Sequence, residues 1–278
     1  MKTVLVTGAT GRVGSRFVPR LLQRENTVRI LVRQAEPFRK LGAEVIVGDL
    51  SAPSSLASAV AGVHTVVHLA AFFRGADQGL IRATNEEGAL ALARAAISAG
   101  VERFVFTSTN LVYGAGRGRP AHEDDPLQPA FPYPQTKVAA EQSLQELYRT
   151  QGLGLRILRL AFVYGEGDPH VAEFLPRLRD WHPAKRLHMV HHADVSQALL
   201  RAVATAGIDG HIYNVADDAP ISIAELLHLN GQPEGSSDAA SSTYDPWEML
   251  VDTLRLRDEL GFRPIYPSYY TARDAGAL

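Results

Sequence analysis

Short apolar runs alternate with amphipathic stretches along most of the chain. The predicted strands are residues 4–6, 27–32, 44–47, 65–69, 104–106, 155–160 and 211–215. The predicted helices are residues 15–23, 54–61, 84–99, 133–149, 195–205 and 254–260. In such an alternation each helix connects one strand to a parallel neighbour by a right-handed crossover. The pattern therefore predicts an α/β fold, a Rossmann-type doubly wound parallel sheet with a smaller C-terminal substrate-binding lobe.

The alternation is interrupted at two places, which divides the chain into a domain and a lobe. We expect residues 1–163, completed by 193–216, to form the dinucleotide-binding Rossmann domain. Residues 164–192 and 217–278 would form the substrate-binding lobe. Inside this lobe, residues 230–242 are rich in Ser, Gly and Ala, which predicts a flexible loop.

A glycine-rich turn follows the first predicted strand directly and opens the first predicted helix. Glycine allows a phosphate to approach backbone N–H groups, and the helix start adds partial positive charge. A tight turn that binds no ligand is the alternative. The residues of this turn that we expect to contact a dinucleotide are Gly8, Thr10, Gly11, Arg12, Val13 and Gly14.

Arg33 ends the second strand, 19 positions after Gly14, where a doubly wound fold reads the adenosine ribose. An acidic residue there favours NAD, whereas arginine can pair with the 2′-phosphate of NADP, and Arg12 can add a second positive charge. We therefore expect NADP to be favoured over NAD. The alternative is a solvated arginine, and nearby Glu36 weakens the charge argument.

Further cofactor contacts are expected where the third and fourth strands end. Asp49 can cap its own turn or accept a hydrogen bond from adenine, and the spacing does not choose between the two. His68 is interpreted as a core histidine rather than a ligand. The other residues expected to contact the cofactor here are Leu50, Leu69, Ala70 and Ala71.

Tyr133 and Lys137 suggest proton-transfer chemistry, because one helical turn separates them and places them on the same face. A tyrosine with a pKa of about 10 must be acidified to exchange a proton at neutral pH. A neighbouring ammonium group and an oxidised nicotinamide would both favour its phenolate. Thr109, after the fifth strand, can polarise a substrate oxygen. The alternative is an ordinary pair of side chains on a helix surface.

Composition and charge exclude several other classes of protein. The chain has 278 residues, a net charge of −2 and no cysteine, so we expect neither a nucleic-acid partner nor a disulfide. The acidic run 123–125 is interpreted as a solvated turn rather than a metal site, and His191 with His192 does not complete one either. The chain begins with a strand and has no long apolar run. We therefore expect a soluble, cytoplasmic protein with no membrane partner.

Taken together, these motifs resemble an extended short-chain dehydrogenase/reductase of the NAD-dependent epimerase/dehydratase family. The segments that carry the resemblance are residues 7–14, 48–50, 68–71, 107–114, 133–137, 159–165 and 192–195. The resemblance implies that Tyr133 is the catalytic acid/base, that Lys137 binds ribose and lowers the tyrosine pKa, and that Thr109 polarises substrate. It further implies a homodimer formed through the helices at 84–99 and 134–149.

The resemblance leaves the substrate open. After Arg159 many nucleotide-sugar enzymes have an asparagine, whereas this chain has Leu160, Ala161 and Phe162. We expect hydride transfer at a carbinol or carbonyl carbon of a small molecule, and a nucleoside diphosphate sugar is one candidate. Arg177 and the histidine pair 191–192 are candidate pocket residues. A simple NADPH-dependent ketone or aldehyde reductase is the alternative, and a non-catalytic NAD(P)-binding regulator or redox sensor is an alternative of another class.

Overall fold

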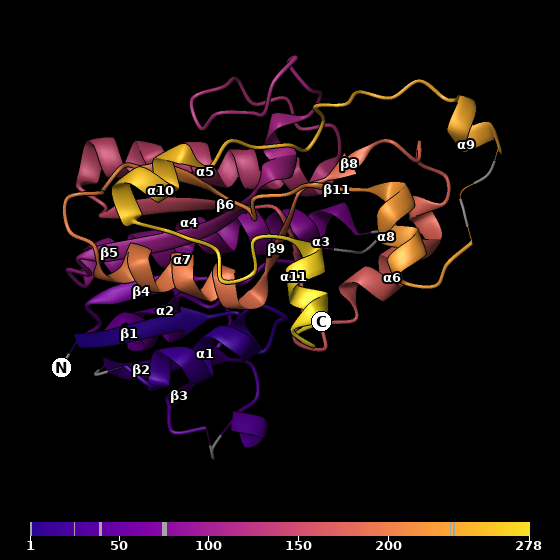
Figure 1. Cartoon of the computed structure of the whole chain (residues 1–278). Coiled ribbons are helices and arrows are strands. Elements are labelled where there is room, and N and C mark those ends of the chain that lie inside the picture. Colours follow the sequence, from indigo (N-terminus) through magenta and orange to yellow (C-terminus); the bar gives the residue numbers. More distant parts are fainter. Residues whose placement is uncertain (1, 25, 39–40, 74–76, 234, 236) are drawn as a thin grey trace. The chain divides into compact units, whose positions relative to one another are not determined.

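A computed structural model describes residues 2–24, 26–38, 41–73, 77–233, 235 and 237–278 (Figure 1). The chain divides into two compact units. The first unit comprises Met1–Val112, Pro129–Arg159 and Ser196–Ile212. The second unit comprises Tyr113–Gln128, Leu160–Val195 and Tyr213–Leu278. Each unit has a hydrophobic cluster of its own.

A seven-stranded sheet has the order β10-β6-β5-β4-β1-β2-β3 (Figure 1). Its strands are β1 (Lys2–Thr7), β2 (Asn26–Val32), β3 (Glu44–Val47), β4 (Thr65–His68), β5 (Arg103–Thr109), β6 (Leu155–Leu160) and β10 (Ile212–Val215). The pairs β1–β2, β1–β4, β2–β3 and β4–β5 are parallel. The predicted fold class is confirmed. The strand order reverses between β1 and β4, and ligands of doubly wound sheets bind outside the carboxyl ends of the strands at such a point.

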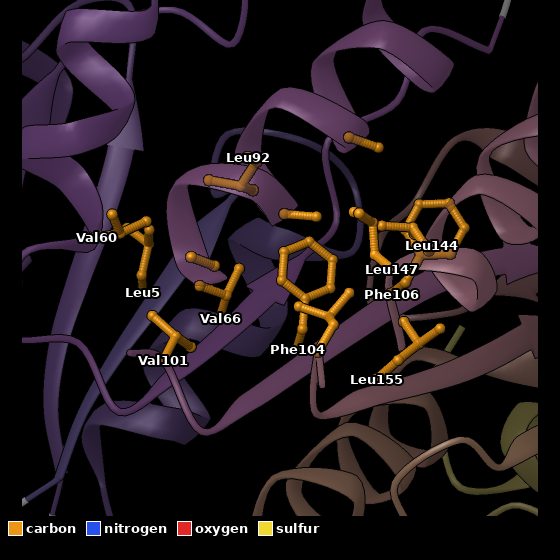
Figure 2. Close-up of a cluster of buried hydrophobic side chains, with 14 of the residues drawn as sticks. Leu5, Val60, Val66, Leu92, Val101, Phe104, Phe106, Leu144, Leu147 and Leu155 are labelled. Carbon is orange, nitrogen blue, oxygen red and sulfur yellow. The ribbon is translucent and has the colours of Figure 1, made fainter. Parts of the chain in front are cut away.

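Helices of the first unit bury the apolar faces predicted from their spacing. They are α1 (Gly14–Leu22), α2 (Pro53–Val60), α3 (Gln78–Arg82), α4 (Gly88–Ser98), α5 (Pro132–Gln151) and α7 (His192–Ala204), which continues from the second unit. Figure 2 shows part of the core, in which Phe104 and Phe106 of β5 lie among Leu92 of α4 and Leu144 of α5. These side chains are fully buried, and each contributes about 1.5–3 kcal/mol through removal from water.

The single helix predicted over residues 84–99 is wrong in its start and its regularity. A helical segment begins with α3 at Gln78, continues through a π-helical turn at Ala83–Glu87, and only then becomes α4. A π-turn accommodates one extra residue, and such turns often occur at functional sites. Here the turn contains the fully buried Asn85.

The second unit contains short elements that periodicity does not detect. β7 (Phe162–Tyr164) pairs in parallel with β9 (Met189–His191), and β8 (Arg186–Leu187) pairs antiparallel with β11 (Ile221–Ser222). The helices are α6 (His170–Leu178), α8 (Ile223–Leu229), α9 (Ser237–Ser241), α10 (Leu254–Leu260) and α11 (Tyr269–Asp274). Strands of two or three residues are too short to show alternation. Helix α9 lies within the segment that was predicted as a loop, so that prediction is wrong for Ser237–Ser241.

The interpretation of residues 123–125 as a solvated turn is also wrong in part. Glu123 is buried, accepts a hydrogen bond from the Asn214 backbone N–H at 2.9 Å, and has a pKa raised by that burial. Asp125 forms a bidentate ion pair with Arg119. The acidic run therefore anchors its loop within the second unit.

Within the described ranges, each helix is either too short or too polar to span a lipid bilayer.

Candidate functional site

Backbone atoms lie so close to the glycine-rich turn that two of its positions have no room for a Cβ. Gly8 has a φ of +72°, and a Cβ there would lie 2.5 Å from the backbone nitrogen of Ala70. A Cβ on Gly14 would collide with the carbonyl oxygen of Gly8. At Gly11 a Cβ would lie 3.3 Å from that same oxygen, a tight contact rather than a collision. Gly8 and Gly14 therefore hold the turn together, whereas Gly11 leaves its outer side uncrowded.

The start of helix α1 suits the pyrophosphate of a dinucleotide, and a buried hydroxyl without a partner in the described part of the chain lies at another strand end of the same sheet. Helix α1 begins at Gly14 with no acidic residue in its first turn, so its partial positive charge is not neutralised there. Ser108 at the carboxyl end of β5 has a buried hydroxyl with no hydrogen-bond partner among the described residues. A buried hydroxyl without a partner is costly unless a ligand or water satisfies it.

Arg33 and Asp49 lie at the ends of β2 and β3, both exposed. Asp49 accepts hydrogen bonds from the backbone N–H and the hydroxyl of Ser51 at 2.9 and 2.7 Å. These bonds hold the pKa of Asp49 below its usual value, and the positive charge of Arg33 lowers it further. Asp49 therefore caps its own turn, one of the two expected roles, while its contact with adenine stays a prediction. Leu50 lies against Gly88 at the start of α4.

Residues 69–73, which follow β4, connect the glycine turn to helix α5. Leu69 and Ala70 lie behind Gly8, and Ala71 is exposed. Phe73 meets the ring of Tyr133 edge to face, with ring centroids 4.7 Å apart. The segment thus contacts the expected phosphate-binding turn at one end and the expected acid/base at the other.

Asn85 fixes this segment to α5 and was missed by the sequence analysis. Its side chain accepts a hydrogen bond from the Phe72 N–H at 2.7 Å and donates to the Phe72 carbonyl at 3.0 Å. It also donates to the Thr136 hydroxyl at 3.1 Å, which in turn donates to the Tyr133 carbonyl at 2.8 Å. The available signal was a lone asparagine in an alanine-rich helix, since buried amides need such partners.

Lys137 is buried on α5, one turn after the partly exposed Tyr133. Its Nζ lies 4.4 Å from the ring centroid of Phe106. Burial lowers the pKa of Lys137 to about 7, although the negative charge of Glu141 opposes the change. Burial also raises the pKa of Tyr133. Without a ligand, burial therefore favours the neutral phenol of Tyr133.

Thr109 and His68 are the last residues of β5 and β4, at the carboxyl ends of these strands. The Thr109 hydroxyl is buried and accepts a hydrogen bond from the Leu111 N–H at 3.3 Å, so its own proton is available to donate. His68 is fully buried, with Nδ1 2.6 Å from the Thr7 hydroxyl, and burial lowers its pKa to about 3. His68 is buried in the core as expected, although its Nε2 has no hydrogen-bond partner among the described residues.

The candidate pocket residues of the second unit have structural partners. His191 Nε2 lies 2.8 Å from the Ala277 carbonyl, and His192 Nε2 lies 2.7 Å from Asp168. Both histidines are fully buried, whereas Arg177 is exposed at the end of α6. Among the residues that the structure describes, no three His, Asp or Glu side chains converge on a possible metal position.

Comparison with known proteins places this arrangement among nicotinamide-dependent enzymes. The model of the NAD dependent epimerase/dehydratase family matches residues 4–216. A 4-hydroxy-2-methyl-3-oxo-4-farnesyl-3,4-dihydroquinoline-1-oxide ketoreductase from Stigmatella aurantiaca is 33% identical over 83% of this chain and 72% of its own. A dTDP-glucose 4,6-dehydratase from Streptomyces griseus is 30% identical over 94% and 89%. A short-chain dehydrogenase/reductase superfamily protein from Agrobacterium tumefaciens, solved with bound NAD, is 28% identical with a TM-score of 0.83 over 98% and 95%.

Proposed function

Because the chain belongs to the NAD dependent epimerase/dehydratase family, we propose that Tyr133 is the acid/base for hydride transfer at a carbinol or carbonyl carbon. A bound nicotinamide cofactor would supply the hydride acceptor or donor for this chemistry. The observation that carries the proposal is the pair formed by Tyr133 and the buried Lys137. The Lys137 Nζ lies 4.4 Å from the Phe106 ring centroid, and its three N–H donors suit the hydroxyls of a ribose.

The residues around this pair would have separate roles in the reaction. Tyr133 would take the proton from a carbinol oxygen, or return it to a carbonyl oxygen. Thr109 would donate a hydrogen bond to that same oxygen and stabilise the charge that develops on it. Asn85, through Thr136, would hold Tyr133 in register with residues 69–73. The Rossmann domain would supply these groups, and substrate binding by the smaller lobe stays a prediction.

The substrate class that the family relatives favour is a nucleoside diphosphate sugar. To test the proposal, we would assay dTDP-glucose and UDP-glucose for product formation with the wild type and with Tyr133→Phe. We expect Tyr133→Phe to lower turnover at least ~100-fold, the scale of general acid–base catalysis. Tyr148→Phe, on the same helix and 38% exposed, is the matched control and should retain full turnover. Equal turnover of Tyr133→Phe and wild type would refute the role of Tyr133.

One observation favours a second candidate, a ketone or aldehyde reductase. Phe73 lies edge-on to Tyr133 yet is 42% exposed, so an aromatic surface stands beside the proposed acid/base. Such a surface suits an apolar carbonyl compound better than a sugar. The two reactions differ in cofactor balance. A reductase consumes one NADPH per product, whereas an epimerase or a dehydratase regenerates its cofactor, so net loss of NADPH absorbance distinguishes them.

We further propose that NADP is preferred over NAD, which the exposed Arg33 at the end of β2 supports. A homodimer is proposed from the family resemblance. It would form through α5 and the helical segment that comprises the π-turn and α4. Light scattering of the purified chain would measure its mass.

A further inference from the structure

Three charged side chains, Lys137, Glu141 and Arg159, are buried near the proposed acid/base. Lys137 and Glu141 are one helical turn apart on the same face of α5, and both are buried. Glu141 forms an ion pair with Arg159 of β6, with Nη2 and Oε2 2.6 Å apart and Nε 3.1 and 3.2 Å from the two carboxylate oxygens. Arg159 is 2% exposed and Glu141 is fully buried. A carboxylate held this rigidly cannot turn toward solvent.

The charged and titratable groups around Lys137 come from three elements. Helix α5 contributes Tyr133 and Glu141, β4 contributes His68, and β6 contributes Arg159 through its pair with Glu141. Tyr133 and His68 are neutral at pH 7, because burial raises the pKa of the tyrosine and lowers that of the histidine. Glu141 is therefore the one anion among these groups that favours the ammonium form of Lys137.

We propose that Glu141 is a positioning residue that acts through Lys137: the carboxylate, oriented by Arg159, keeps the buried ammonium protonated for its work beside Tyr133. The inference rests on the proposed function for the use of that ammonium. The electrostatic link itself depends only on the folded chain. If the pair were merely a structural bridge between α5 and β6, removal of its charge would lower the stability of the fold without moving the pH profile of turnover.

The small number of lysines in the chain allows the titration of Lys137 to be followed separately. It has only four lysines, Lys2, Lys40, Lys137 and Lys185. Lysine labelled with ¹³C at Cε would give four NMR signals, and Lys137→Arg would identify the one of interest. We expect its midpoint to fall by about one pH unit in Glu141→Gln, as removal of a charge one turn away predicts at an intermediate dielectric.

Matched variants separate charge from packing. Glu141→Asp retains the charge and should keep the midpoint near that of the wild type. Glu146→Gln removes an exposed charge from the same helix and should leave the midpoint unchanged. Should Glu141→Gln fail to fold, the double variant Glu141→Gln/Arg159→Met removes both charges at similar volume. Its midpoint should also lie below that of the wild type. An unchanged or raised midpoint in the folded Gln variants would overturn the proposal.

Activity then tests the dependence on the proposed function separately. If protonated Lys137 supports turnover, the alkaline limb of the kcat/KM profile should move to lower pH in Glu141→Gln by the same amount as the NMR midpoint. A moved NMR midpoint with an unmoved alkaline limb would support the link from Glu141 to Lys137, while it would contradict the role given to Lys137 under the proposed function.

Discussion

The glycine turn and helix α5 hold their candidate site residues by different physical means. The turn is built from backbone: Gly8 and Gly14 are needed because a Cβ at either position would meet main-chain atoms. The candidate site at helix α5 depends on side chains instead. Lys137 and Glu141 lie on the helix, and Asn85 contacts it from the π-helical turn. All three are buried polar groups with specific neighbours. Backbone requirements tolerate almost no substitution, whereas side-chain requirements can be removed one at a time.

The largest effect is expected in the turn. Gly14→Ala should prevent stable folding, because the added methyl collides with the Gly8 carbonyl and the backbone must shift. Gly11→Ala adds the same methyl with a contact of 3.3 Å and should cost less than about 1 kcal/mol of unfolding free energy. Urea denaturation of both variants measures the difference. Equal stability of the two would contradict the distinction between these glycines.

A smaller effect is expected when the clamp formed by the hydrogen bonds of Asn85 to Phe72 and Thr136 is broken. Asn85→Ala leaves the Phe72 N–H and carbonyl without their partner, which should cost about 2 kcal/mol of unfolding free energy. Turnover should also fall at least ~10-fold, because small displacements of a catalytic group are costly.

Thr136→Val sharpens the same test, since it removes the hydroxyl between Asn85 and the Tyr133 carbonyl but leaves the bonds to Phe72. We expect the Thr136→Val substitution to have a larger effect on turnover than on the free energy of unfolding. Thr150→Val removes an equivalent hydroxyl-to-carbonyl bond at the far end of α5 and should leave turnover unchanged. If both threonine variants behave alike in turnover, the clamp does not position Tyr133.

The smallest effect is expected at the exposed Arg33, which follows β2. Arg33→Ala should weaken NADP binding about 10-fold, equivalent to about 1.4 kcal/mol, and leave NAD binding nearly unchanged. Titration calorimetry with each nucleotide measures both affinities. Arg24→Ala, also exposed, serves as the control for loss of positive charge. A loss of affinity that is equal for the two nucleotides would show that Arg33 does not recognise the 2′-phosphate.

Sequence patterns predicted the sheet well because strands such as β1, β4 and β5 are buried over most of their length and are largely apolar. They predicted the second unit poorly. Its strands have two or three residues, and its buried Glu123 accepts a hydrogen bond from a residue 91 positions away. The prediction of a solvated acidic turn considered only the local charge, which is why it was wrong for Glu123.

What the sequence determined by itself was local: the glycine turn, the strand-and-helix alternation, and the placement of Tyr133 and Lys137 on one helical face. Each of these depends on residues within a few positions of one another. Tertiary structure decided the surroundings that give those residues their chemistry. Asn85 meets Thr136 across 51 positions, and Arg159 meets Glu141 across 18. Periodicity records which face is buried, but a buried polar group is given its role by partners that only the folded chain brings within hydrogen-bonding distance.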